Sequence, residues 1–200
     1  DDAHGFGTMG KTGAGIGEEQ NCIDDIDIYF STFAKSMASI GGFLAADKKL
    51  LTYLRYNMRS QIYAKSLPMA FVAGNLKRLE LLRGQPELRE KLWHNVNRLQ
   101  NGFRERGFDL GTTNTPVTPV FMKGGLYDAV QLTYDMRENH NIFCSVIVYL
   151  VIPKGQIELR IIPTAAHSDK DIDETLAAFS AVQEKLDKKL YPQEMPMVGA

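Results

Sequence analysis

One lysine in this sequence, Lys35, stands in a setting suited to chemistry. It follows the hydroxyl side chains of Ser31 and Thr32, and residues 31–36 contain no other charge. A lysine removed from solvent loses its proton more easily, as Schiff-base chemistry requires. Neighbouring hydroxyls can also hydrogen-bond the oxygens of a phosphate. Taken alone, however, a single lysine is more often a surface charge.

Other candidate groups lie at both ends of the chain. Asp1 and His4 are three residues apart and could face one pocket, although a pair within a loop is the simpler interpretation. Arg160 lies in an apolar run, where a guanidinium can hold a carboxylate through two parallel hydrogen bonds. The alternative for Arg160 is an exposed edge residue that alternates with buried neighbours. His167 could be catalytic or could cap the last helix.

The elements that position these residues follow from apolar spacing and from turn residues. A glycine-rich loop occupies residues 5–17, and its spacing does not match a dinucleotide-binding fingerprint because no strand precedes it. We expect strands at 26–31, 41–46, 62–64, 117–122, 142–152 and 156–162, helices after Asp47, Pro68 and Pro86 and at 126–138 and 169–190, and a flexible tail at 191–200. This alternation predicts an α/β fold.

Composition restricts the possible partners. The 200 residues carry a formal net charge of -1, which offers no electrostatic basis for binding nucleic acid. The longest apolar run, residues 142–152, is too short to span a bilayer, so we expect no integral membrane segment. Cys22 and Cys144 have no partner at metal-binding or redox spacing, which predicts free thiols, no metal site and a cytoplasmic location.

Five segments resemble, in order, those of the α-oxoamine synthases, a family of fold-type-I pyridoxal-phosphate enzymes. The resemblance covers residues 1 to about 190 and rests on Asp-Asp-Ala-His (1–4), a glycine loop (9–15), Ser-Thr-Phe-Ala-Lys-Ser (31–36), a Ser-Leu-Pro loop (62–68) and a strand followed by Ala-Ala-His (159–168). Each motif is modest by itself, and their order makes the signal strong.

The resemblance implies a site for pyridoxal 5'-phosphate. Asp1 would keep the pyridine nitrogen protonated, and His4 would hydrogen-bond the phenolic oxygen and serve in catalysis. Lys35 would hold the cofactor covalently and move protons at the α-carbon of the substrate. Thr32 would bind the phosphate, and Ser66 would reach the phosphate of the partner subunit in a homodimer whose active site lies at the interface.

The resemblance also implies the fold. Residues 1–95 would form the carboxy-terminal part of the cofactor-binding large domain, and residues 96–190 a small α+β domain. In the latter, Arg160 would bind the carboxylate of the amino-acid substrate. Asp2 replaces the family's usual glutamate, a position with no assigned cofactor contact, and Ala34 replaces a serine of some members. Because upstream family segments do not precede Asp1, we expect the fragment alone to be inactive.

The family condenses an amino acid with an acyl-CoA, in most members with decarboxylation. The segments around Lys35 and Ser66 are most similar to those of serine palmitoyltransferases, which implies serine and palmitoyl-CoA as substrates and a place in sphingolipid biosynthesis. Glycine C-acetyltransferase and 8-amino-7-oxononanoate synthase activities are the alternatives. A non-catalytic subunit and a plain α/β binding domain are rivals from other classes, and Lys35, Asp1 and Arg160 together argue against the first.

Overall fold

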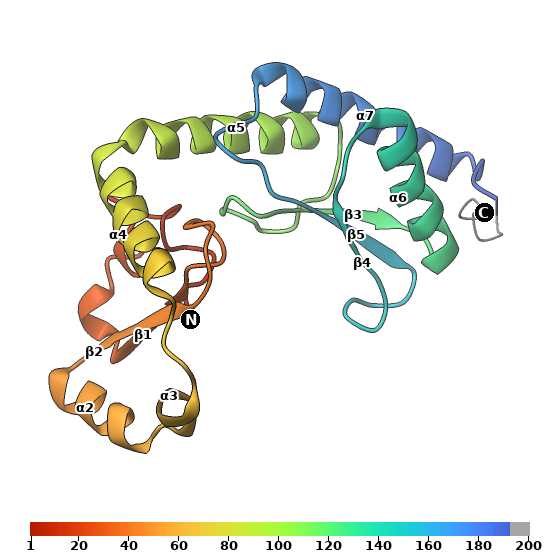
Figure 1. The fold of residues 1–200 in the computed structure, drawn as a ribbon. Helices are drawn as coiled ribbons and strands as arrows, with labels where there is room; N and C mark the ends of the chain where they lie inside the picture. The colour runs from red at the N-terminus through yellow and green to blue at the C-terminus, as the bar shows by residue number, and fades with distance from the viewer. Residues whose placement is uncertain (193–200) are drawn as a thin grey trace. The chain divides into compact units, whose positions relative to one another are not determined.

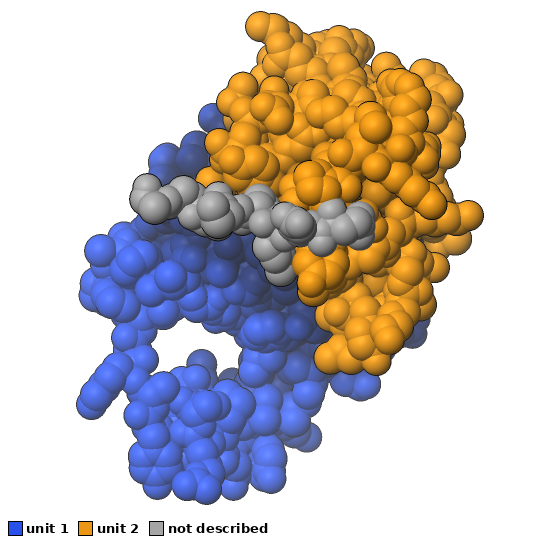
Figure 2. Space-filling model, turned by 90° about the vertical axis from the view of Figure 1, so that its right-hand side faces the viewer, with its two compact units in different colours: residues 1–90 blue, residues 91–200 orange. Residues whose placement is uncertain are grey.

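The computed structural model, which describes residues 1–192, contains helices and two small sheets (Figure 1). The chain is of the α/β class, as expected. It divides into two compact units, residues 1–90 and residues from Lys91 onward, which Figure 2 shows in different colours. The division falls inside helix α5 (Pro86–Glu105). The assignment of residues 1–95 and 96–190 to the large and small domains of the family stays a prediction.

The first unit contains one antiparallel β-hairpin and several helices. Strand β1 (Ile28–Thr32) pairs with β2 (Gly42–Ala46), and Ser31 lies opposite Phe43. The other elements are α1 (Ile16–Glu19), the 3-10 helix η1 (Ile23–Asp25), α2 (Lys48–Asn57), α3 (Arg59–Tyr63) and α4 (Met69–Gly84). The hairpin therefore presents the chain between its two strands, where Lys35 lies, as a loop.

Turn and cap chemistry explains where the helices begin. The Asp47 carboxylate accepts a hydrogen bond from the Lys49 N–H at 2.8 Å and so caps α2. Pro68 precedes α4, and Pro86 is the first residue of α5, where the missing N–H costs nothing. The extended piece predicted at residues 62–64 is wrong at Ile62 and Tyr63, which lie in α3, where the Ile62 N–H bonds to the Met58 carbonyl.

The second unit is built on an antiparallel sheet in the order β3-β5-β4. These strands are β3 (Thr118–Lys123), β5 (Gln156–Ile161) and β4 (Ser145–Ile147). On one face Val120 lies opposite Leu159, and Met122 lies opposite Ile157. All four side chains are buried. Alternation then places Arg160 on the opposite face.

Helices α5, α6 (Leu126–His140) and α7 (Asp169–Asp187) supply the rest of this core. Phe103 of α5 and Phe179 of α7 are fully buried, and their ring centroids lie 4.8 Å apart in an edge-to-face arrangement. Cys144 is a free cysteine at the edge of this core, and burial raises the pKa of its thiol to about 11. None of the helices within residues 1–192 combines the length and the apolar character that crossing a membrane requires.

Two expected boundaries in this unit are wrong. The apolar run 142–152 forms a strand only at β4, because the chain turns after it and the Val151 N–H bonds back to the Val148 carbonyl. Tyr191, which was assigned to a flexible tail, is held in place, since its hydroxyl donates to Asp135 at 2.7 Å. Residues 193–200 of that predicted tail lie outside the described part of the chain.

Asp135 fastens the end of α7 to α6. Its carboxylate, on a residue only 5% exposed, accepts hydrogen bonds from Lys185, Asn139 and Tyr191, each at 2.7 Å. Burial opposes ionisation, but these three donors outweigh it and lower the pKa of Asp135. The same burial, together with the hydrogen bond to Asp135, raises the pKa of Tyr191.

This cluster predicts a pH-dependent contribution to stability. Because the folded-state pKa of Asp135 lies below its unfolded value, the stabilisation is present above the unfolded pKa, near 4, and is lost as the pH falls through the folded pKa. We expect Asp135→Asn to lower stability at neutral pH by about 1–3 kcal/mol. Thermal unfolding of both proteins between pH 7 and pH 3 should show the difference shrinking with acid, and a constant difference would contradict this assignment.

Candidate active site

The amino-terminal segment is attached to the strand that leads to Lys35. The Asp2 N–H donates to the Phe30 carbonyl at 2.8 Å, and the buried Ser31 hydroxyl donates to the Asp2 carbonyl at 3.2 Å. Farther along, the Ser36 hydroxyl donates to the Phe6 carbonyl at 2.7 Å. The segment that carries Asp1 and His4 therefore lies beside β1 and beside the Lys35 loop, although the three residues are up to 34 positions apart in sequence.

Within this segment the two acids have different environments. Asp1 is exposed, and its Oδ1 accepts from the Ala3 N–H at 2.9 Å, which leaves the carboxylate oriented toward the local turn. Asp2 is 7% exposed, and its Oδ2 accepts from the Ile16 N–H and from the Tyr29 hydroxyl, each at 2.8 Å. Burial and then the hydrogen bond to Asp2 raise the pKa of Tyr29.

Asp2 is thus a residue of this site whose structural role could not be predicted from the sequence. No role for Asp2 follows from its sequence context, yet its side chain joins the glycine-rich loop to β1. Its neighbours in sequence carry no signal of this, because Ile16 and Tyr29 lie 14 and 27 residues away. The adjacency of Asp1 and Asp2 could have suggested that one acid is structural, since successive residues of an extended segment face opposite sides.

The glycine-rich loop is held by charged side chains of the chain itself. The Glu18 carboxylate accepts from the Thr12 and Ala14 N–H groups at distances from 3.0 to 3.1 Å. Burial is the largest single influence and opposes ionisation, but the hydrogen bonds from Thr12 and Ala14, helped by the charge of Arg89, together outweigh it and lower the pKa of Glu18. The Arg89 guanidinium donates to the carbonyls of Thr12 and Lys11. The Thr12 and Ala14 amides of this loop are therefore occupied within the chain itself.

The Lys35 loop closes by hydrogen bonds across its ends. The Thr32 hydroxyl donates to the Gly41 carbonyl at 2.9 Å and accepts from the Ala34 N–H at 3.1 Å. The Ala38 N–H donates to the Lys35 carbonyl at 2.9 Å, which places Lys35 at the start of a tight turn. The Lys35 side chain is exposed in this structure. The reason is its place on a turn between two strands, where the unit's own side chains do not cover it.

Ser66 lies in the exposed segment between α3 and α4. The next residue, Leu67, packs close to Gly41: a Cβ atom built on Gly41 would lie 2.9 Å from Leu67 Cδ1. The Ser-Leu-Pro segment is therefore adjacent to the end of the Lys35 loop. A cavity of about 390 Å³ in the same unit is lined by β1, β2, α2 and the start of α3, including Phe30, Phe43 and Leu54, and none of the candidate site residues lines it.

Arg160 lies in the second unit, on the central strand β5. Its backbone pairs with Pro119 of β3 and Ser145 of β4, so the alternative of an edge residue is wrong. Its Nε atom is buried and, among the described residues, has no hydrogen-bond partner. The side chain is partly exposed on the sheet face opposite the core. A buried, unpartnered guanidinium nitrogen suits an anion that is not part of the chain.

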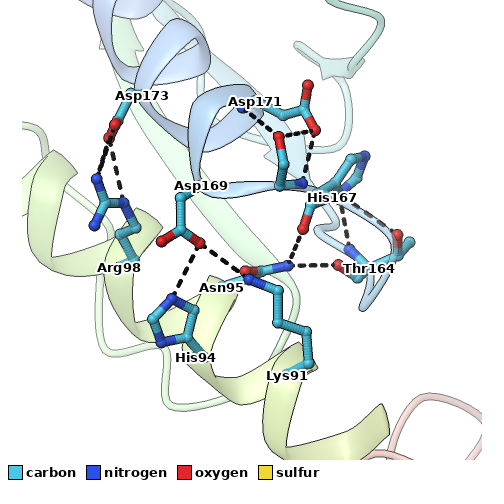
Figure 3. A network of polar contacts seen from close by, with 10 residues as sticks. Lys91, His94, Asn95, Arg98, Thr164, His167, Asp169, Asp171 and Asp173 are labelled. Atoms are coloured by element: carbon cyan, nitrogen blue, oxygen red, sulfur yellow. Dashed lines mark hydrogen bonds and ion pairs between the residues drawn. The ribbon is translucent and has the colours of Figure 1, made fainter.

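His167 closes a turn and does not cap the last helix. Its ring Nδ1 accepts from the Thr164 N–H at 3.0 Å, and its carbonyl accepts from Asn95 (Figure 3). The cap of α7 is Ser168, whose hydroxyl accepts from the Asp171 N–H at 3.2 Å. Within the described residues, no group of three or more His, Cys, Asp or Glu side chains is arranged to hold a metal ion.

Comparison with known proteins agrees with this geometry. The family model described as aminotransferase class I and II matches residues 1–179. The chain is 61% identical to a cysteate-C-fatty acyltransferase of Capnocytophaga ochracea, over 96% of this chain and 46% of that protein. It is 36% identical to an 8-amino-7-oxononanoate synthase of Petrotoga mobilis, over 95% of this chain and 47% of that protein.

Solved structures show the same relationship. A serine palmitoyltransferase from S. paucimobilis with bound pyridoxal phosphate and myriocin superposes with a TM-score of 0.86 at 27% identity, covering 94% of this chain and 47% of that one. The chain thus spans about half the length of the relatives it matches. The chain belongs to the class I and II aminotransferase family, and within that family it is of the α-oxoamine synthase type.

Proposed function

We propose that the full-length protein is a pyridoxal-phosphate-dependent C-acyltransferase that condenses an amino acid with a fatty acyl-CoA. The observation that carries this proposal is the attachment of the Asp1–His4 segment to β1 and to the Lys35 loop through Asp2, Ser31 and Ser36. That attachment gathers an acid, an imidazole and a lysine in one unit.

Family membership indicates pyridoxal phosphate as the cofactor, and the residues present fit it. Asp1 offers an exposed carboxylate for the pyridine nitrogen, and the exposed Lys35 amine is accessible to an aldehyde. Arg160 has a buried Nε without a partner, which suits the carboxylate of an amino acid. The fit is less direct at Thr32, because its hydroxyl donates to Gly41 and would have to exchange that bond for one to the phosphate.

The bound cofactor supplies an electron sink for the α-carbon of the amino acid. The chain's own residues do the rest. Asp1 would keep a proton on the pyridine nitrogen, His4 would hydrogen-bond the phenolic oxygen, and Lys35 would hold the cofactor and then move a proton at the α-carbon. Ser66 and Thr32 would bind the phosphate. We also propose a homodimer, in which Ser66 serves the partner's site, and a cytoplasmic location.

For the amino acid we propose cysteate. The support is the 61% identity to a protein named for cysteate, against 35% to a curated serine palmitoyltransferase. Serine with palmitoyl-CoA, and with it a role in sphingolipid biosynthesis, is the second candidate, which the similarity of the segments around Lys35 and Ser66 favours. Both amino acids present the same α-carboxylate to Arg160. They differ in the side chain, which ends in a sulfonate in cysteate and in a hydroxyl in serine.

The test is a titration of the full-length protein, loaded with pyridoxal phosphate, by L-cysteate, L-serine, L-alanine and glycine. We expect the visible absorbance of the cofactor to shift at the lowest concentration with L-cysteate, and palmitoyl-CoA then to be consumed with release of carbon dioxide. A preference for L-serine would replace cysteate by the second candidate. If no amino acid alters the absorbance, the acyltransferase proposal itself fails.

A further inference from the structure

A buried amide side chain joins α5 to the segment that follows β5. Asn95 is 0% exposed, and its Nδ2 donates to the Thr164 carbonyl at 2.8 Å and to the His167 carbonyl at 2.9 Å (Figure 3). These acceptors lie 69 and 72 residues away in sequence. Both hydrogen bonds go to the backbone of another segment, so the side chain fixes the position of that segment.

The segment that Asn95 holds is a tight turn with its own internal bonds. The Thr164 N–H donates to His167 Nδ1 at 3.0 Å, and the His167 N–H donates to the Thr164 carbonyl at 3.3 Å. The Ala166 N–H donates to the Thr164 hydroxyl at 3.3 Å. These bonds connect the ends of the turn to each other, and the two hydrogen bonds from Asn95 attach the turn to α5.

Arg160 is four residues before this turn. It is the penultimate residue of β5, so the ladder continues beyond it for only one residue, Ile161. Between the strand and the turn lie Ile162 and Pro163, and the proline ring restricts the backbone of this short link. Because this link is short, a displacement of the turn would also displace the end of β5 and with it the side chain of Arg160.

The ion pairs on either side of Asn95 do not hold the turn at Thr164 and His167. Lys91 with Asp169 (3.0 Å) and Arg98 with Asp173 (2.7 Å) also connect α5 to α7, as Figure 3 shows. Their side chains are between 40% and 57% exposed, and exposed ion pairs contribute little to stability. They offer a control on the same helix.

We propose that Asn95 is a positioning residue for Arg160. By fixing the turn at Thr164 and His167, it sets the guanidinium in the orientation that receives the carboxylate of the amino-acid substrate. The inference rests on the proposed function, since it takes Arg160 as the carboxylate ligand. In this proposal Asn95 itself contacts neither the substrate nor the cofactor.

The experiment measures L-cysteate and L-serine binding to the full-length, cofactor-loaded protein from the change in cofactor absorbance. Asn95→Ala should raise the Kd of the amino acid about tenfold, because small displacements of a binding group have large effects. The kcat at saturating amino acid and the KM for palmitoyl-CoA should stay within about twofold of the parent protein. Arg98→Ala, the matched control, should leave all three unchanged. An unchanged Kd in Asn95→Ala, or a loss confined to kcat, overturns the proposal.

A double-mutant cycle separates this inference from the proposed function. If Asn95 acts through Arg160, then adding Asn95→Ala to Arg160→Ala should raise the Kd no further, whereas independent effects would multiply and overturn the proposal. An Arg160→Ala variant that binds both amino acids normally refutes the role of Arg160 itself. If thermal unfolding shows that Asn95→Ala is not folded, His167→Ala provides the test instead. This variant removes the ring acceptor of the turn and should raise the Kd of the amino acid by a smaller factor. An unchanged Kd would overturn the proposal.

Discussion

Replacement of Lys35 by alanine is expected to abolish the condensation reaction in the full-length protein. Proton transfer by a positioned side chain alone contributes about 10²–10⁴-fold to a rate, and Lys35→Ala also removes the covalent attachment of the cofactor. The turnover of amino acid and acyl-CoA should therefore fall by at least that factor. Borohydride reduction of the parent protein followed by peptide mapping should place the cofactor on the peptide that contains Lys35.

Lys48→Ala provides the control for this prediction. Lys48 is an exposed lysine of the same unit, at the start of α2, so the substitution removes an equivalent charge away from the site. Its activity and labelling should match those of the parent protein. Label on another lysine, or an active Lys35→Ala variant, would show that Lys35 does not hold the cofactor, whereas no label on the parent protein would favour a binding domain over an enzyme.

The second large effect is expected from Gly15→Ala. Gly15 has a φ of +104°, and a Cβ atom at this position would lie 1.8 Å from Asp2 Oδ2 and 2.8 Å from the Tyr29 hydroxyl. The substitution therefore combines the strain of a left-handed backbone with displacement of the buried Asp2 carboxylate from its two donors. Together these effects should lower the stability of the first unit by about 2–5 kcal/mol.

Gly107→Ala separates the two causes. Gly107 has a φ of +78°, but nothing lies within 4 Å of a Cβ atom built there, so only the backbone strain remains. The unfolding temperature of the full-length protein should fall further with Gly15→Ala than with Gly107→Ala, and cofactor occupancy should fall only with Gly15→Ala, since Asp2 holds the segment of Asp1 and His4. Equal effects on both measures would show that the contact with Asp2 contributes nothing.

Local sequence patterns predicted most of the secondary structure. Asp47 and Pro86 marked the starts of helices correctly, because caps and first-turn prolines act within a few residues. The apolar run 142–152 misled, since only β4 within it found a partner in β5, and Phe143, Leu150 and Val151 on either side of β4 are exposed rather than part of a strand. Ile62 and Tyr63 lie in α3, although an extended piece was expected there. A run of three residues is too short to show whether its apolar positions repeat with the period of a helix or of a strand.

The sequence by itself determined the class of fold, the resemblance to the α-oxoamine synthases and the candidate residues Asp1, His4, Thr32, Lys35, Ser66 and Arg160, because motif order and residue type are properties of the chain alone. Only the tertiary structure decided that Asp2 joins the glycine-rich loop to β1, that Arg160 lies on a central strand and that Asn95 holds the turn after it. The physical reason is distance along the chain. The hydrogen bonds that fix these positions connect residues from 14 to 72 positions apart, and no local pattern records a partner that far away.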